Sequence, residues 1–499
     1  MIRLFGGKPE HPLADPKEAR RILGALPEDG FKALEELEHW LESAGAAETL
    51  RPEARVQALF AVDEAAQPRL RRLAREYFAS ERLSRFHENR LWRALHGYYR
   101  QAGISFAGAV DLFVQGAKAG SEVRAMLPAL LVRTLRNLGQ HLKWMHLRYG
   151  PIDPGTWAAL NGVYALAEAR GLAHARVAPY PALPGESTPQ LEFLRATMFS
   201  ASAPDCLRPA EADLAERLIA TFAPKFAIAG TPAPWFPFWT DLGKAMAPAR
   251  SGRGDGASSG TRWFGAGAAL AELEAFVGCI EAGGPVPSDL AGATGTDAEI
   301  LLGVLRHLVR AWSPLPSERR SRRHAVKSRV AVIHGFDGVR SVLGKADALG
   351  SEAAGAESWV VENVSAGGFG AAVPQPKDDW LRVGALVALQ PEGGANWVLG
   401  VVRRVNRTRA REARVGIETL ARSAELLRFD AGGASEEGIL IREDSAGSAR
   451  ILIAPGVYAP EQNLESRREG RIYLYLPQGI VGRGEDYDLV RYREMIRES

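Results

Sequence analysis

The segment 317–326 reads SERRSRRHAV and places four arginines within five positions, directly before a predicted strand. A second segment, 362–370, reads ENVSAGGFG and ends another predicted strand in a glycine-containing turn. Around both segments, short runs of alternating apolar and polar residues are separated by glycines. Several short strands at this spacing are typical of a small antiparallel β-barrel or sandwich.

The alternating pattern begins after Pro314 and continues to the C-terminus. The runs are 326–333, 359–364, 385–389, 397–405 and 415–420, followed by 438–441, 449–453 and 471–476, with 457–458 and 487–492 as further candidates. We therefore expect a small antiparallel barrel or sandwich after Pro314 and a small β-rich C-terminal unit over 432–499. The latter is either a second domain or an extension of the first sheet.

The first half of the chain has helical periodicity instead. Apolar residues recur every three or four positions, as expected for helices that bury one face. The clearest stripes are Phe31/Leu34/Leu37/Leu41, Leu131/Leu135/Leu138/Leu142/Met145, Leu214/Leu218/Phe222 and Leu301/Val304/Leu305/Leu308/Trp312. We expect a helical region over 1–247 and a helical segment over 262–313. Between them, 248–261 (PARSGRGDGASSGT) reads as a flexible Gly/Ser-rich linker or loop.

Composition and length limit the class of protein. A chain of 499 residues predicts roughly two to four domains. Its 46% hydrophobic and 24% charged content is that of an ordinary globular protein. No apolar run approaches the roughly 18 residues of a membrane span, and the start of the chain lacks a signal-peptide core. We expect a cytoplasmic protein whose two cysteines are structural thiols.

The arginine-rich segment has a chemistry suited to nucleotides. A guanidinium group is planar, permanently charged and carries five donors. It can grip a phosphate with two hydrogen bonds, pair with the O6/N7 edge of guanine, or stack on a purine. The same segment taken alone also fits a solvated basic linker between domains.

The second segment offers polar groups beside a sharp turn. Asn363 and Ser365 are two residues apart in a predicted strand, so their side chains are expected on one face. Gly367 and Gly368 allow a tight turn and close approach of a ligand to the backbone. Alone, this pattern also fits an ordinary strand followed by a glycine turn.

Taken together and in this order, the two segments resemble the PilZ family. The RxxxR pattern of Arg319 and Arg323 precedes a (D/N)xSxxG pattern formed by Asn363, Ser365 and Gly368. Residues 399–405 and 415–418 also resemble later strands of that family. The resemblance covers about 316–425. It departs from the family in 335–357, which looks like an insertion or extended hairpin that could shade the pocket.

The resemblance implies a six-stranded antiparallel barrel that binds the bacterial second messenger cyclic di-GMP. By that resemblance, Arg319 and Arg323 hold phosphates and guanine edges, while Asn363 and Ser365 bond a guanine from the barrel face. Gly368, with Gly367, allows the turn. Arg320 and Arg322 add positive charge whose role the pattern does not define.

Other functions have weaker support in the sequence. A second basic cluster (Arg403, Arg404, Arg407, Arg409, Arg411, Arg414) could contact nucleic acid, but no helix-turn-helix, zinc finger or RNP-type strand accompanies it. The histidines show no metal-ligand spacing, and there is no phosphate loop or GxSxG motif. An enzyme in the helical region would require a deep pocket with strongly shifted pKa values.

The sequence thus predicts an α+β multidomain protein with no catalytic residues and no metal or cofactor. Its leading interpretation is a cyclic di-GMP receptor that relays the signal to a protein partner through the helical region, by inter-domain rearrangement. The alternatives are a PilZ-like scaffold that binds no nucleotide and a basic nucleic-acid-binding protein.

Overall fold

The computed structural model of the chain describes all residues except 1–10, 80–82, 116–120, 183, 253–257, 288–289, 291–297, 316–320, 345–354, 375–379, 395, 409–410, 443–446, 469 and 498–499. The chain divides into two compact units. The first, comprising 1–204 and 209–317, is mainly helical. The second, comprising 205–208 and 318–499, is mainly β-structure.

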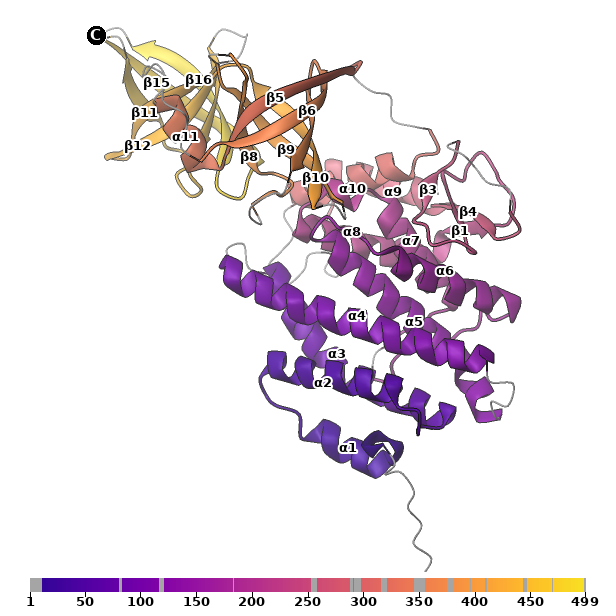
Figure 1. Ribbon diagram of the computed structural model, residues 1–499. Coiled ribbons are helices and arrows are strands. Elements are labelled where there is room, and N and C mark those ends of the chain that lie inside the picture. Colours follow the sequence, from indigo (N-terminus) through magenta and orange to yellow (C-terminus); the bar gives the residue numbers. More distant parts are fainter. Residues whose placement is uncertain are drawn as a thin grey trace, which may run out of the picture. The chain divides into compact units, whose positions relative to one another are not determined.

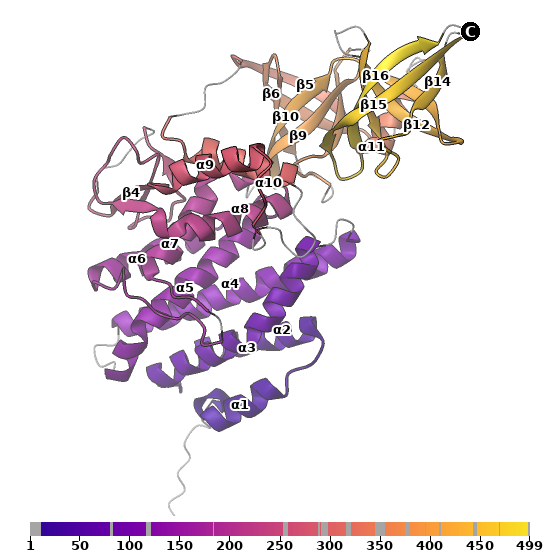
Figure 2. The same cartoon turned by 180° about the vertical axis from the view of Figure 1, so that it is seen from behind.

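The first unit is a stack of helices arranged in successive layers (Figures 1 and 2). Its α-helices are α1 (Pro16–Gly24), α2 (Gly30–Ala46), α3 (Pro52–Ala79), α4 (Arg85–Gln115), α5 (Ser121–His146), α6 (Pro154–Ala169), α7 (Pro189–Ala201), α8 (Pro209–Phe222), α9 (Ala269–Glu281) and α10 (Ala298–Trp312). Short 3₁₀ turns lie at Pro12–Ala14, Pro204–Cys206 and Ala223–Lys225. Helix α5 is central, because it packs against α3, α4, α6 and α7.

The apolar stripes read from the sequence form the helical core. The leucines of the first stripe lie on α2, and the other three stripes lie on α5, α8 and α10; all are buried except Phe31, which is partly buried. Polar contacts then tie the layers together. Buried Lys143 on α5 pairs with Asp213 at 2.6 Å and Glu216 at 3.3 Å, both on α8. Such a pair is costly to break, because its partners would remain buried and charged.

A four-stranded sheet lies in residues that the sequence predicted as helical or as the linker 248–261. Its order is β1 (Ala227–Ala229), β4 (Thr261–Gly265), β2 (Phe238–Asp241) and β3 (Ala249–Arg250). The cross-strand pair Trp239 and Trp263 packs with Phe236. Helical periodicity could not reveal strands this short. The segment 248–261 therefore contains β3 and the connection from β3 to β4 within one unit, and its residues 253–257 lie outside the described part.

The second unit begins with the barrel expected from the sequence, which we call the middle barrel. Six antiparallel strands close it: β5 (His324–His334), β6 (Glu357–Ser365), β7 (Gly368–Pro374), β8 (Leu386–Pro391), β9 (Val398–Arg407) and β10 (Glu412–Ala421). Inward residues such as Trp359, Val373, Leu389 and Val405 are buried. The α+β class and the antiparallel six-stranded barrel are therefore confirmed.

The β-rich C-terminal unit is a second closed barrel, not an extension of the first sheet. Its strands are β11 (Glu425–Ala431), β12 (Ala434–Arg442), β13 (Ser448–Ile453), β14 (Leu464–Arg468), β15 (Arg471–Arg483) and β16 (Asp488–Arg497). This C-terminal barrel begins at Glu425, earlier than the expected residue 432. Among the candidate strands, 487–492 falls largely within β16, whereas 457–458 forms no strand.

The two barrels have the same connectivity. In cyclic order the middle barrel runs β5-β6-β7-β10-β9-β8, and the C-terminal barrel runs β11-β12-β13-β16-β15-β14. Numbered within each barrel, both read 1-2-3-6-5-4 and return to strand 1 through the β5–β8 and β11–β14 pairs. Both barrels are antiparallel throughout.

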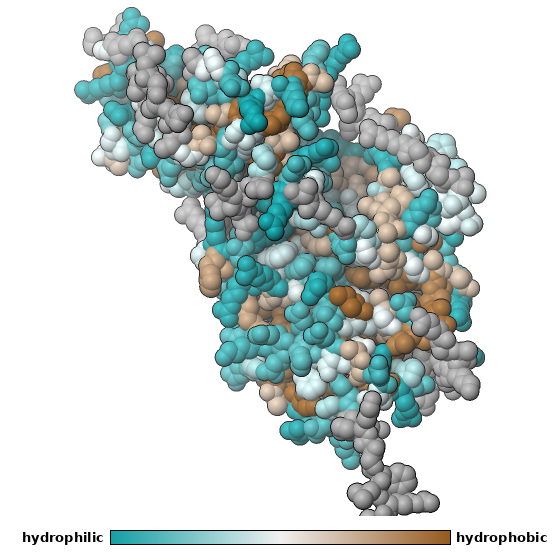
Figure 3. All heavy atoms as spheres, viewed as in Figure 1, coloured by the Kyte–Doolittle hydropathy of each residue, from teal (hydrophilic) through white to brown (hydrophobic). Residues whose placement is uncertain are grey.

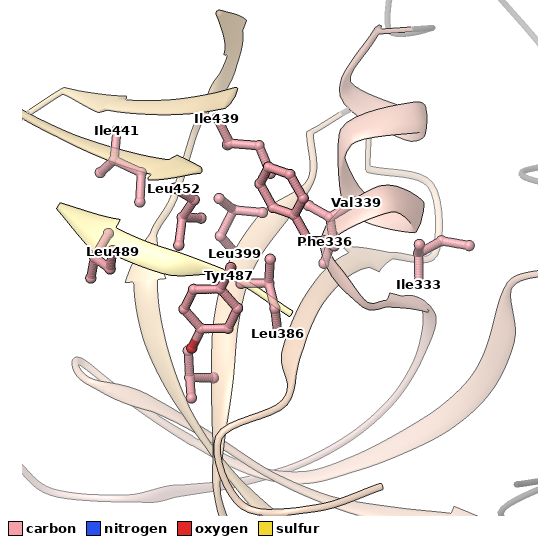
Figure 4. Packing of buried hydrophobic residues seen from close by; sticks show 12 residues of the cluster. Ile333, Phe336, Val339, Leu386, Leu399, Ile439, Ile441, Leu452, Tyr487 and Leu489 are labelled. Atoms are coloured by element: carbon pink, nitrogen blue, oxygen red, sulfur yellow. The ribbon is translucent and has the colours of Figure 1, made fainter. Parts of the chain in front are cut away.

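The residues expected as an insertion or extended hairpin include a helix that joins the barrels. Helix α11 (Phe336–Gly344) follows β5 directly, and residues 345–354 lie outside the described part. Its Phe336 and Val339 share one cluster with strand residues of both barrels (Figure 4). The cluster comprises Ile333, Phe336, Val339, Leu386, Ala388, Leu399 and Val401 with Ile439, Ile441, Leu452, Tyr487 and Leu489. We call it the joint core.

Polar contacts also cross the joint core. The carboxylate of Asp486 accepts a 2.7 Å hydrogen bond from the Phe336 amide at the start of α11. An acidic group there also interacts favourably with the helix dipole. The Tyr487 hydroxyl donates to the carbonyl of Gly384 at 3.2 Å. The barrels are therefore joined by specific contacts and not by a linker alone.

The surface of the helical unit is mostly hydrophilic in the view of Figure 3, where hydrophobic residues form small separate patches. This texture is that of a surface in contact with water. Among the described helices, none combines the length and apolarity needed to cross a bilayer.

Replacing Phe336 with alanine should destabilise both barrels together. Phe336 is buried, and a large-to-small change in a core costs about 3–5 kcal/mol in the free energy of unfolding. Chemical denaturation followed by hydrogen exchange would measure the loss in each barrel. The matched control is Phe86→Ala, because Phe86 is 80% exposed and its loss should change stability by about 0.5 kcal/mol or less. Destabilisation confined to the middle barrel would contradict a shared core.

Candidate functional site

A cavity of about 420 Å³ lies at one end of the middle barrel. This end, which we call the site end, is where β5 begins and β6 finishes. The cavity is lined by Val364, Ser365, Ala366, Phe369, Pro391, Gly394, Asn396, Val398, Thr419 and Arg422. It brings together the ends of β6, β8 and β10 with the starts of β7 and β9. Its lining combines apolar side chains with hydroxyl, amide and guanidinium groups, which suits a ligand with a flat apolar part and polar edges.

Ser365 is the motif residue that lines this cavity. It is the last residue of β6, and its hydroxyl donates a 3.3 Å hydrogen bond to the carbonyl of Gly368. Because that bond is long, a ligand acceptor could compete for the hydroxyl. Two motif residues therefore meet across the β6–β7 turn.

Gly368 has a packing role that sequence reasoning missed. A Cβ atom on Gly368 would lie 2.0 Å from the Ile417 carbonyl oxygen on β10. No side chain fits there, so β7 approaches β10 this closely only with glycine. Gly367, in contrast, has open space around the position of a Cβ. The glycine of the motif is thus required by the barrel itself.

Asn363 lies across from Gly370 in the β6–β7 pair. A Cβ on Gly370 would come within 2.5 Å of the Asn363 side-chain nitrogen, so the amide lies over the bare backbone of Gly370. Glycine at position 370 therefore leaves room for the Asn363 side-chain amide close to the sheet. Asn363 itself is partly exposed and is not among the residues that line the cavity.

Arg322 and Arg323 directly precede β5 at the site end. His324 pairs with Val364, which lines the cavity, so the two arginines enter beside it. Both are exposed, and in the described part of the chain neither forms an ion pair. Their charges are therefore available to an anion. Arg319 and Arg320 lie outside the described residues.

Arg422 is a lining residue that the motif pattern did not reveal. It follows β10, is exposed, and makes no ion pair with any described residue. The only signal in the sequence was its position two residues after the predicted strand 415–420. Asn396 lines the cavity from the loop between β8 and β9, where the sequence has no motif, whereas Phe369 directly follows the motif residue Gly368.

Within the second basic cluster, Arg403 and Arg404 differ from these arginines because each has an ion-pair partner. Arg403 on β9 pairs with Glu418 on β10 at 2.6 Å. An exposed pair such as this largely cancels its own charge. Arg409 lies outside the described residues.

The expected shading of the pocket by 335–357 is wrong for helix α11. Helix α11 follows the last residue of β5, whereas the cavity lies where β5 begins. The helix therefore packs at the opposite end of the strand, in the joint core. Its apolar face, with Phe336 and Val339, explains why it is buried there instead of covering a polar cavity.

Comparison with protein-family models gives two matches. Residues 17–233 match the N-terminal domain of the cyclic-di-GMP receptor FimW. Residues 352–425 match the middle PilZ domain of the same receptor, a range that includes the (D/N)xSxxG segment and not the arginine segment. No curated protein matches the chain.

The matched N-terminal region contains a cavity of about 710 Å³ between α4, α5 and α6. Its walls include Trp92, His96, Arg100, His141 and Asp153. Burial lowers the pKa of His96 to about 4 and that of His141 to about 3. This is the kind of pocket that would favour an enzyme. However, a general base works best with a pKa near the working pH, and these two imidazoles lie well below it.

The same cavity gives no support for a metal site. No group of three or more His, Cys, Asp or Glu side chains suited to a metal ion occurs in the described ranges. His96 stacks on Trp92 with a ring distance of 4.4 Å and lies 5.0 Å from His141. Both histidines are therefore packed as neutral aromatic groups.

Acid should destabilise the helical unit through His141. Because its folded-state pKa is depressed, the unfolded chain binds more protons below pH 6.5, so stability is complete above that pH and is lost as pH falls. Arg100 and His96 add to the depression, and Asp153 opposes it. His141 alone should contribute a loss of about 2 kcal/mol between pH 6.5 and 5. Urea denaturation at both pH values would measure it.

The variant His141→Gln should reduce that pH dependence, whereas exposed His174→Gln should leave it unchanged. An equal pH dependence in wild type and His141→Gln would contradict the assignment.

Proposed function

The chain belongs to the family of the cyclic-di-GMP receptor FimW, with a PilZ domain as its middle barrel, and on this premise we propose that it binds cyclic di-GMP at the site end. The chain then acts as a non-catalytic receptor in the cytoplasm. The observation that carries the proposal is that Ser365 lines a cavity at the end of the barrel where Arg322 and Arg323, which have no ion-pair partner among the described residues, lead into β5.

The chemistry of each group fits a dinucleotide with two phosphodiesters. Arg319 and Arg323 grip phosphates and guanine edges, and Arg320 and Arg322 add charge around them. Asn363 and Ser365 bond a guanine, which lies against the Gly367–Gly368 turn. Arg422 reaches the ligand from the other side of the cavity. Without a ligand these like charges repel one another, so an anion is the natural partner.

Signal relay follows from the place of the arginine segment in the chain. Trp312, the last residue of α10, is buried in the helical unit, and Arg322 lies only ten positions further along the chain. A ligand that orders this segment against the barrel favours one arrangement of the two units over others. The helical unit then presents the change to a protein partner.

Binding should depend on the arginine pair. We expect micromolar or tighter affinity, about −8 kcal/mol or better, by calorimetric titration with cyclic di-GMP. The double variant Arg319→Ala/Arg323→Ala should lose about 10²-fold or more, because each charge-assisted hydrogen bond contributes about 1.5–3 kcal/mol. The matched control is Arg329→Ala, an exposed arginine further along β5, which should bind as wild type.

Absence of binding by the wild type would make the middle barrel a scaffold or interaction module. Equal loss in the double variant and in Arg329→Ala would point to general electrostatic attraction, as in a nucleic-acid-binding surface.

The inter-domain rearrangement can be measured separately from the affinity for cyclic di-GMP. On adding cyclic di-GMP, hydrogen exchange should slow in the segment between α10 and β5, and small-angle scattering should change. Tight binding that leaves both observables unchanged would contradict the relay while leaving the receptor function intact.

A further inference from the structure

The C-terminal barrel has an end that corresponds to the site end. In the middle barrel, that end holds the start of strand 1, the end of strand 2, the end of strand 4 and the last part of strand 6. Since both barrels share the 1-2-3-6-5-4 order, the corresponding positions can be found by strand number. They are Glu425, Arg442, Arg468 and Glu494, with Tyr475 near the start of strand 5.

These five residues form one connected polar network. Arg442 pairs with Glu425 at 3.3 Å, and Arg468 also reaches Glu425 at 3.3 Å. Arg468 pairs with Glu494 at 3.2 Å, and the Tyr475 hydroxyl donates to Glu494 at 3.1 Å. The carboxylates of Glu425 and Glu494 thus pair with the guanidinium groups of Arg442 and Arg468.

At this end, the two barrels therefore differ in whether their arginines have carboxylate partners. In the middle barrel, Arg322, Arg323 and Arg422 have no carboxylate partner among the described residues, and a cavity of about 420 Å³ lies between strand ends. In the C-terminal barrel, Arg442 and Arg468 already have anions supplied by the chain. Glu494 is partly buried, with 15% of its side chain exposed, so its pair with Arg468 is screened less by salt than an exposed pair.

We infer that the C-terminal barrel is a second copy of the middle barrel whose ligand end is filled by its own ion pairs, with Glu425 and Glu494 standing where phosphates would bind. The chain therefore has two barrels of one topology and takes cyclic di-GMP at only one of them. This inference rests on the proposed function for the middle barrel. It also limits the ligand to one molecule, or one stacked assembly, per chain.

The first experiment locates all dinucleotide binding by calorimetric titration of the full-length chain. Asn363→Ala/Ser365→Ala should abolish binding, whereas Arg442→Ala/Arg468→Ala should keep the wild-type affinity within about twofold and the same stoichiometry. Residual binding in the first variant that disappears when Arg442 and Arg468 are also replaced would overturn the inference. No binding by the wild type would instead overturn the proposed function, and this inference with it.

A second experiment tests the filled end without the dinucleotide. Glu425→Gln/Glu494→Gln keeps the side-chain size and the acceptor for Tyr475 but removes both charges, which leaves Arg442 and Arg468 without anions. Inorganic phosphate should then raise the Tm of this variant by several degrees more than that of wild type, because a ligand that binds only the folded state stabilises it.

The matched control is Glu436→Gln, a partly buried glutamate elsewhere on β12, which should respond to phosphate as wild type does. An equal Tm shift in wild type and in Glu425→Gln/Glu494→Gln would overturn the assignment of these carboxylates as internal anions.

Discussion

The second unit depends on one apolar contact, the packing of α11 between two closed barrels. Phe336 and Val339 fill the joint core from one side, while Leu386 and Leu399 of the middle barrel meet Ile439 and Leu452 of the C-terminal barrel (Figure 4). Each small barrel alone has few residues to bury, and the joint core adds a common interior. The site end lies where β5 begins, and the buried residues of the joint core are not among those that line its cavity.

The sequence predicted the middle barrel well because its signals are local. Alternation along β6 and β9, the arginine segment and the (D/N)xSxxG segment each lie within a few residues. The sheet of β1–β4 and the closure of the C-terminal barrel escaped prediction, since strand pairing joins distant segments, as in Glu425 with Leu440 and Ile451 with Val490. Arg422 escaped for the same reason: only the folded barrel brings it to Ser365.

Packing requires glycine at two positions of this segment, whether or not a ligand binds. A Cβ atom on Gly368 would clash with the Ile417 carbonyl oxygen, and a Cβ atom on Gly370 would clash with the Asn363 side-chain amide. A substitution at either position therefore disturbs the barrel and the site together, and loss of binding there says little about ligand contacts. Ser365, Arg323 and Arg422 are more informative positions, because their side chains are not needed for strand packing.

Closure of both barrels also limits how a partner chain can pair a strand with these domains. A closed barrel leaves fewer unpaired backbone groups than an open sheet, which protects these domains against edge-to-edge aggregation. A partner that recognises its target by adding a strand needs such an edge. The four-stranded sheet of the helical unit has open edges at β1 and β3, which are three and two residues long and offer little to pair with. In the middle barrel, β5 pairs with β8 only from Val330 onward, so among the described strands the first part of β5 is a longer free edge for an added strand.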